Sequence, residues 1–360
     1  MRIWLAATLV LALFWAGGCT GYRQELEERV VLDQGVAVRK QPSPGAAPVF
    51  SVSLGDRVWV VKDKSRTGDD GALWVLIKQG KEQGWSPAVH LVSPGGLEAA
   101  LAQRYAEVLS RLDLGRLDAL ETASDAYQRL FALAPKSPAA GEAFRAFLRL
   151  HDELSALAYD VMQPVRPYYV RVGYQLSALA DPASITDPAA RQAVQSLQQA
   201  GYMLGHSEGM LYVTTDPEFL LGFAGYVPNA LAGFLVLRAE ESRRPVASDG
   251  ALRISWDQLR SRAVAAEIWA RDNPGLPETP QAEAWAERYF TFYLRGMDNT
   301  PIFPLGSNQL DPELKASYEL FLAHNQDSDW YGRVQEFYAL LEKNGFARTN
   351  QVREYMSRPR

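Results

Sequence analysis

The sequence predicts a multidomain protein, with a small all-β barrel at residues 29–92 and a larger, mainly α-helical domain at residues 97–360. In the first region, short β-branched runs alternate with turn residues, which is typical of a small barrel. In the second region, apolar residues recur every three or four positions, as on the buried face of a helix. Ser-Pro-Gly-Gly at 93–96 separates the two patterns and indicates a linker.

Residues 1–18 have the pattern of a secretory signal peptide. A positive tip is followed by an apolar run from Ile3 to Trp15 and then by small residues, and the run is too short for a comfortable membrane span. The only cysteine, Cys19, comes directly after two glycines. We expect the mostly polar residues 19–28 to be a tether that leads to the first domain.

The junction at Cys19 resembles a bacterial lipobox. The resemblance implies that Cys19 carries fatty acyl groups such as palmitate, becomes the mature N terminus and holds the protein at a membrane of the cell envelope. Thr20-Gly21 lacks the aspartate that retains such lipoproteins in the inner membrane. This implies the periplasmic face of the outer membrane if the organism is Gram-negative. The alternative is an ordinary secreted protein with a chance cysteine.

Within residues 29–92, strands are expected where β-branched or aromatic residues lie between turn signals. Gln41–Gly45, Gly55-Asp56 and Thr67–Gly71 provide these turns, and their glycines suit positions that need a positive φ angle. The expected strands are Val30–Leu32, Val36–Arg39, Val49–Leu54, Val58–Val61, Leu73–Ile77 and Gly84-Trp85.

A family resemblance rests on the order and spacing of four short motifs. Val38-Arg39, Leu54-Gly55-Asp56, Trp74-Val75 and Gly84-Trp85 together resemble the bacterial SH3 domain. The resemblance implies an SH3-like barrel that acts as a targeting or docking module, with cell-wall peptides or envelope proteins as its partners.

Three residues are the candidate binding residues of this barrel. A functional face would use Trp59 or Trp85 together with the loop that contains Pro44. The alternative interpretation places both tryptophans in the barrel core, since small barrels commonly use aromatic side chains for packing.

After the linker the pattern predicts one helix after another, interrupted by a hairpin-like segment at Tyr202–Val213. Ser137-Pro138 and Asp187-Pro188 have the residue types that begin helices. Residues 168–174 fit a strand and a helix start equally well. The expected helices are 97–114, 117–133, 139–161, 187–200, 218–225, 228–241, 255–273, 281–294, 312–324, 328–344 and 349–356.

Aromatic residues are crowded between Trp256 and Tyr338, mostly at helical spacing. Such spacing favours a packed core, with a ligand groove as the alternative. The order of motifs from Gly201-Tyr202 to Gly296–Thr300 resembles the C-terminal helical region of other exported SH3-bearing proteins of unknown activity. That resemblance implies no particular function.

His206, Glu208 and Asp216 are the weak candidates for chemistry. A His-x-Glu pair on a strand directs both side chains to one face, where they could act as acid and base. A murein hydrolase could use Glu208 and Asp216 as its two carboxylates. One histidine and one glutamate make only half a zinc site, so we expect no metal or cofactor. The alternative is a surface loop in which Asp216 caps a helix.

Composition restricts the function further. The chain has 37 basic and 42 acidic residues and a net charge of −5, which gives no reason to expect nucleic acid as a partner. The sequence therefore predicts a lipid-anchored cell-envelope binding or scaffold protein rather than an enzyme. A murein hydrolase and a periplasmic ligand sensor with an aromatic pocket between helices are the alternatives.

Overall fold

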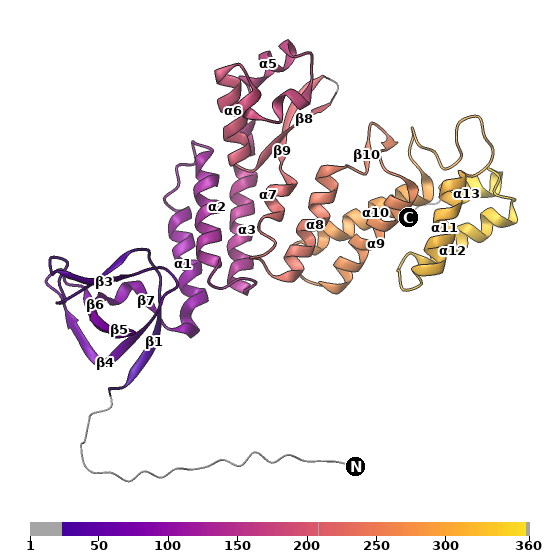
Figure 1. The fold of residues 1–360 in the computed structure, drawn as a ribbon. Helices are drawn as coiled ribbons and strands as arrows, with labels where there is room; N and C mark the ends of the chain where they lie inside the picture. Colours follow the sequence, from indigo (N-terminus) through magenta and orange to yellow (C-terminus); the bar gives the residue numbers. More distant parts are fainter. Residues whose placement is uncertain (1–23, 208, 358–360) are drawn as a thin grey trace, which may run out of the picture. The chain divides into compact units, whose positions relative to one another are not determined.

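The computed structural model describes residues 24–207 and 209–357. Figure 1 shows the chain, which divides into two compact units, the first ending at Leu97 and the second beginning at Glu98. The predicted signal peptide, Cys19 and Glu208 lie outside the described residues. None of the helices in the described ranges combines the length and apolarity needed to span a bilayer.

The first unit is a curled antiparallel sheet of seven strands in the order β3-β2-β6-β5-β4-β1-β7. Among the described residues no pairing joins β3 to β7, so the sheet is a half-barrel with two edges. The prediction of an all-β region followed by a mainly helical one is confirmed. The strands are β1 Leu26–Val31, β2 Val36–Arg39, β3 Pro48–Val52, β4 Arg57–Thr67, β5 Leu73–Gln79, β6 Glu82–Pro87 and β7 Leu91–Val92.

The inner face of this sheet is packed with small aliphatic side chains. Gly84 permits the close approach of β6 to β2, because a Cβ atom there would lie 2.8 Å from Val38 Cγ1 and 2.9 Å from the Arg39 carbonyl oxygen. Strand β1 begins within the segment expected as a tether, where Glu28 pairs with Trp59. The buried core consists of Val31, Val36, Val38, Val52, Val58 and Ile77.

The second unit is mainly helical and contains two small hairpins. Residues 168–174, undecided from sequence, lie in the helix α5 and the turn that follows it. The helices are α1 Leu97–Leu109, α2 Asp118–Phe131, α3 Pro138–Glu153, α4 Ser155–Val161, α5 Val165–Arg171, α6 Pro188–Gln199, α7 Pro217–Leu221, α8 Asn229–Arg243, α9 Trp256–Asp272, α10 Thr279–Arg295, α11 Pro312–His324, α12 Tyr331–Lys343 and α13 Asn350–Ser357. The hairpins are β8 Tyr202–Ser207 with β9 Met210–Thr215, and β10 Ala247–Ser248 with β11 Ala251–Leu252.

Side-chain caps fix several helix starts. Ser137 Oγ accepts a hydrogen bond of 3.1 Å from the Ala140 amide, and Pro138 occupies the first helical position. The Asp187 carboxylate accepts from the amides of Ala189 and Ala190. Both starts confirm the sequence prediction.

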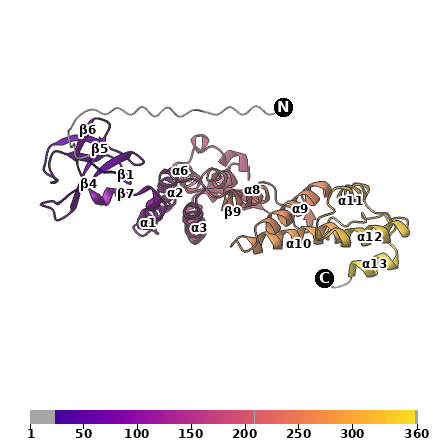
Figure 2. The same ribbon diagram turned by 90° about the horizontal axis from the view of Figure 1, so that it is seen from below.

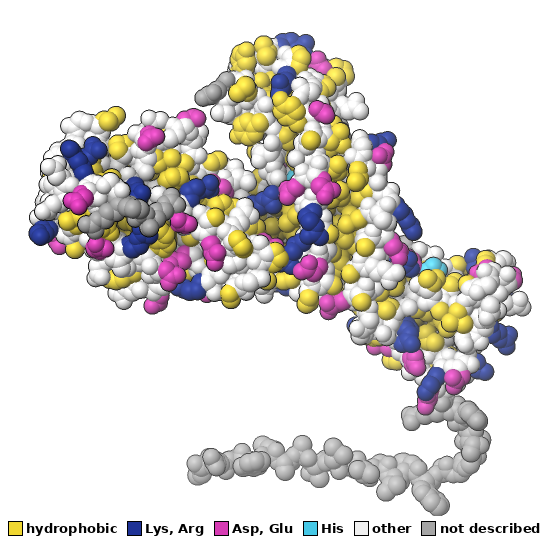
Figure 3. Space-filling view, turned by 180° about the vertical axis from the view of Figure 1, so that it is seen from behind, with side chains coloured by type: hydrophobic (Ala, Val, Ile, Leu, Met, Phe, Trp, Pro, Cys, Tyr) yellow, Lys and Arg dark blue, Asp and Glu magenta, His cyan; other side chains and the backbone are white. Residues whose placement is uncertain are grey.

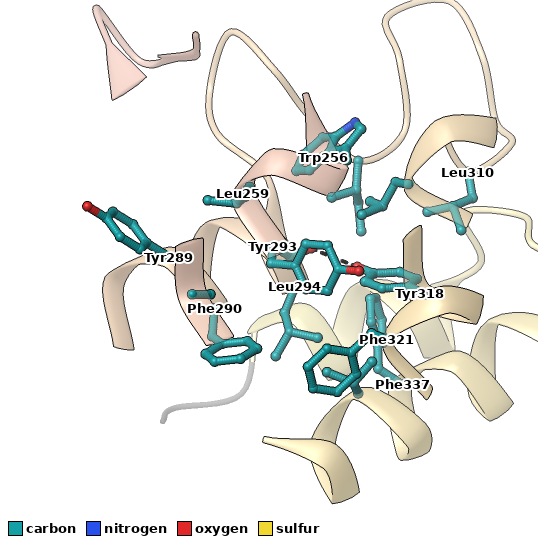
Figure 4. Packing of buried hydrophobic residues seen from close by; sticks show 14 of the residues in the cluster. Trp256, Leu259, Tyr289, Phe290, Tyr293, Leu294, Leu310, Tyr318, Phe321 and Phe337 are labelled. Atoms are coloured by element: carbon teal, nitrogen blue, oxygen red, sulfur yellow. Dashed lines mark hydrogen bonds between the residues drawn. The ribbon is translucent and has the colours of Figure 1, made fainter. Parts of the chain in front are cut away.

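The aromatic residues of the C-terminal helices form a packed core, as predicted. Figure 4 shows these side chains converging from α9, α10, α11 and α12. The polar ends of two buried tyrosines are satisfied within the core: the Tyr293 and Ser317 hydroxyls are 2.9 Å apart, and the Tyr318 hydroxyl donates to the Tyr293 carbonyl at 2.8 Å. Helices α9 and α10 pack along each other and support this core (Figure 2).

A largely buried ion pair links the early and late helices of this unit. Arg145 on α3 donates from Nε to Glu278 Oε1 at 2.7 Å and from Nη2 to Glu278 Oε2 at 2.9 Å. The side chains are 14% and 9% exposed. This two-point contact fixes the start of α10 against α3.

Candidate functional site

The two candidate tryptophans lie on the same, outer face of the curled sheet. Trp59 on β4 is paired with Lys78 on β5, and Trp85 on β6 is paired with Leu76 on β5. Residues opposite each other in an antiparallel pair share a face, and so do residues two apart on one strand. Leu76 and Lys78 are two apart, so all four side chains share one face. Trp59 is 44% exposed and Trp85 is partly exposed.

Two arginines are neighbours of Trp85. Arg39 is its partner on β2, and the guanidinium carbon of Arg66 lies 5.4 Å from the centre of the Trp85 ring system. At this distance a cation is attracted to the face of the aromatic ring. The Arg66 guanidinium therefore lies over the ring system of Trp85, which remains partly exposed.

The loop that contains Pro44 borders this face. Lys40 N donates to the Ala47 carbonyl at 3.0 Å, and Arg39 Nη1 donates to the Ala46 carbonyl at 2.7 Å. These bonds connect the loop to Arg39, the residue that pairs with Trp85. The Pro44 side chain is exposed.

A second loop is joined to the first. Ser43 Oγ donates to Asp69 Oδ2 at 2.8 Å, which holds the loop at 40–47 beside the loop at 67–72. The second loop is itself fixed by Trp74, whose Nε1 donates to Asp70 Oδ1 at 3.1 Å. This hydrogen bond is the main reason why the pKa of Asp70 lies below its usual range.

Trp74 has a different role from the other two tryptophans of the sheet. It is only 2% exposed, and a Cβ atom at Gly68 would lie 2.5 Å from its Nε1. Trp74 lies two residues before Leu76 on β5 and so shares the outer face, but the loop at 67–72 covers it, whereas Trp59 and Trp85 are at least partly exposed. We name the surface formed by Arg39, Trp59, Arg66, Lys78 and Trp85 the tryptophan–cation face.

The cations of this face were not among the binding residues predicted from the sequence. Arg39, Arg66 and Lys78 come from three different strands. Glu28, which pairs with Trp59, is the nearest acidic partner in the strand register, and it is occupied by Arg57 at 2.7 Å. Alternation along β5 relates only Lys78 to Leu76, whereas the places of Arg39 and Arg66 depend on strand pairing. Chemically, aromatic rings beside cations suit an extended ligand that carries carboxylates.

The candidate acid and base residues of the helical unit do not form a comparable site. The His206 ring, on β8, lies 6.3 Å from the Tyr169 ring. His206 pairs with Leu211, and Asp216 lies five residues beyond Leu211, about 16 Å along an extended strand. His206 and Asp216 therefore lie toward opposite ends of the hairpin.

Asp216 is a helix cap. Its Oδ1 accepts from the Glu218 amide at 2.9 Å at the start of α7, which confirms the capping alternative. Glu208 lies outside the described residues. Within the described ranges no group of three histidine, cysteine, aspartate or glutamate side chains could hold a metal ion.

Comparisons with known proteins identified no relative of this chain. No protein-family model, no curated protein and no solved structure matches the chain.

Proposed function

We propose that this protein is a lipid-anchored binding protein of the cell envelope, in which the curled sheet is an SH3-like docking module. The lipobox-like sequence at Cys19 supports the anchor, and the motif order between Val38 and Trp85 supports the SH3-like identity. The helical unit is then a scaffold that the anchor and the docking module hold at the envelope.

The ligand that suits the docking module is an extended peptide with free carboxylates, such as the peptide stems of the cell wall. The observation that carries this proposal is that Trp59 and Trp85 share one face with Arg39, Arg66 and Lys78. Tryptophan and arginine are the residues most often responsible for binding energy at interfaces. The cations orient carboxylates, and the rings cover the apolar parts of the peptide.

Co-sedimentation with purified cell-wall sacculi tests this proposal. The full-length protein is compared with Trp59→Ala, Trp85→Ala and the control Val89→Ala, whose side chain is 64% exposed outside the face. Loss of an aromatic side chain at the centre of an interface typically costs about 2 kcal/mol or more, which corresponds to about 30-fold weaker binding. We expect such a loss for Trp85→Ala and a smaller one for Trp59→Ala. Binding should also weaken as salt is raised, because charges contribute.

Two outcomes would contradict the proposal. If both tryptophan variants bind sacculi as tightly as the control, the tryptophan–cation face is not the docking site. If the unaltered protein does not sediment with sacculi but captures an envelope protein through the same face, the docking function stands and the cell-wall ligand is wrong.

A further inference from the structure

The helical unit contains an apolar cavity of about 340 Å³. Its walls are the 3₁₀ helix η3 (Leu176–Leu179), α6 and β8. The volume lies at the lower end of the range for small-molecule sites. The lining residues are Leu176, Ser177, Leu179, Ala180, Val194, Leu197, Gln198, Tyr202, Met203 and Leu204.

The residues that line the cavity favour an uncharged ligand. It consists mainly of leucine, valine and methionine side chains and includes no charged residue. Two of its polar groups already have partners, since the Tyr202 hydroxyl donates to the His151 carbonyl and Gln198 Nε2 donates to the Ala180 carbonyl at 3.1 Å. A charged ligand group inside the cavity would lose its hydration without compensation.

The apolar surface continues beyond the cavity along the β8–β9 hairpin. The register places Met203, Gly205, Met210 and Tyr212 on one face, and Met203 also lines the cavity. The polar Ser207 and Thr214 share this face at its two ends. Tyr212 lies across Gly205, because a Cβ atom there would be 2.3 Å from the tyrosine ring. Met210 is 67% exposed and Tyr212 is 45% exposed.

The surface around the cavity also exposes apolar side chains. In Figure 3 hydrophobic side chains are visible over much of the lobe that carries α5, α6 and β8. Val170 and Tyr174, which precede η3, are 53% and 52% exposed. A compact cavity with an elongated apolar continuation fits a long, thin ligand better than a round one.

We propose that this cavity binds a single aliphatic chain of a lipid, with its terminal methyl end between η3, α6 and β8 and its polar end in solvent. Leucine and methionine walls adapt to a flexible chain. Each methylene group that enters such an environment increases affinity about four-fold. The site lies wholly in the helical unit and is independent of the tryptophan–cation face.

Competition with dodecylamine that carries a dansyl label on its nitrogen, at the polar end of the chain, tests the site on the full-length protein. We expect saturable binding at one site, and displacement by dodecanol at about sixteen-fold lower concentration than by decanol, because two methylene groups are added. Dodecanoate should compete about as well as dodecanol, since the polar end stays in solvent. A lysophospholipid with the same chain distinguishes the two sources of the ligand. Competition would show that a phospholipid headgroup fits outside the cavity, and lack of competition would indicate a free fatty acid or alcohol.

Variants assign the binding to the cavity. Ala180→Trp adds a large side chain to the lining, and Met203→Lys places a charge in the wall. Each should weaken binding at least ten-fold. Ser184→Trp is the matched control, since Ser184 is exposed in the neighbouring segment and does not line the cavity. Circular dichroism on each variant shows whether the fold is retained.

The proposal is overturned if folded Ala180→Trp and Met203→Lys bind the probe as the control does. It is also overturned if the protein binds phospholipid vesicles but neither alcohol displaces the probe. That result would indicate adsorption of the exposed apolar surface to a membrane instead of insertion of one chain.

Discussion

The outer face of the curled sheet and the C-terminal helices use aromatic side chains in different ways. In the curled sheet, Trp59 and Trp85 lie on the outer face and have charged residues as strand neighbours. In the helical unit, aromatic residues such as Phe290 and Phe321 are fully buried against one another. An aromatic side chain on a strand is therefore a binding candidate when charged residues lie beside it and its own side chain is partly exposed. The number of aromatic residues in a segment does not distinguish binding from packing.

The largest expected effect of this difference is on stability. Phe321→Ala removes a side chain with no exposed surface from the aromatic core of the helical unit. The lost burial and the cavity that remains should lower the free energy of unfolding by about 3–5 kcal/mol. Urea unfolding followed by far-ultraviolet circular dichroism, whose signal comes mainly from helices, measures this. A loss below about 1 kcal/mol would mean that the aromatic core of the helical unit tolerates repacking, so that burial of an aromatic side chain there does not imply tight packing.

The second effect concerns charge. The helical unit largely buries the cation Arg145, whereas several cations of the sheet are exposed. Arg145→Ala leaves the Glu278 carboxylate buried without its two-point partner. Removal of one member of such a pair typically costs about 3 kcal/mol or more. The same urea experiment should show this loss.

A double-mutant cycle separates the contact from the burial penalty. Arg145→Ala together with Glu278→Ala should be less destabilised than the sum of the two single changes, because no uncompensated charge is left. Strict additivity would show that the two side chains do not depend on each other in solution.

The third effect is a pH dependence carried by His151. This side chain is 1% exposed, its ring stacks on Tyr202 at 4.1 Å, and its Nε2 lies 3.3 Å from the Gly201 carbonyl. Burial lowers the pKa of His151 to about 4, below the usual value of about 6.5. The unfolded chain therefore takes up a proton at a higher pH than the folded protein does.

The sign follows from this order of pKa values. The contribution of neutral His151 to the free energy of unfolding is complete above about pH 6.5 and is lost as the pH falls toward 4. At pH 5 the loss amounts to about 2 kcal/mol. His151→Gln, which has no ionisable group, should lack this part of the pH dependence. Urea unfolding of both proteins at pH 7 and pH 5 gives the difference. Parallel losses in the two proteins would show that other groups carry the acid sensitivity.

Helix starts could be predicted from sequence because their causes are local. Ser137, Asp187 and Asp216 each bind amides two or three residues ahead, so a short segment contains both partners. The segment that became α5 was ambiguous because its two tyrosines and two valines suit strands. Burial of Tyr168 and Tyr169 against the rest of the unit favours the helix.

The tryptophan–cation face could not be predicted because it depends on strand register. The pairing of β4 with β5 shifts between Val60 and Ser65, and Asp63 within this segment has a φ angle of 61°. A shift of one residue would move Trp59 to the other face of the sheet. The residues of the face were visible in the sequence, but their shared side was not.

The smallest expected effect most directly tests the difference between an exposed and a buried aromatic side chain, because it concerns two tryptophans of one sheet. Trp59→Ala should change the free energy of unfolding of the sheet by no more than about 1 kcal/mol, since the side chain is 44% exposed and lies among polar neighbours. Trp74→Ala should cost about 3–5 kcal/mol, because it empties a buried site and frees Asp70 from its hydrogen bond. Thermal unfolding of the two variants followed by tryptophan fluorescence distinguishes them. Equal losses would make Trp59 a packing residue and remove it from the docking face.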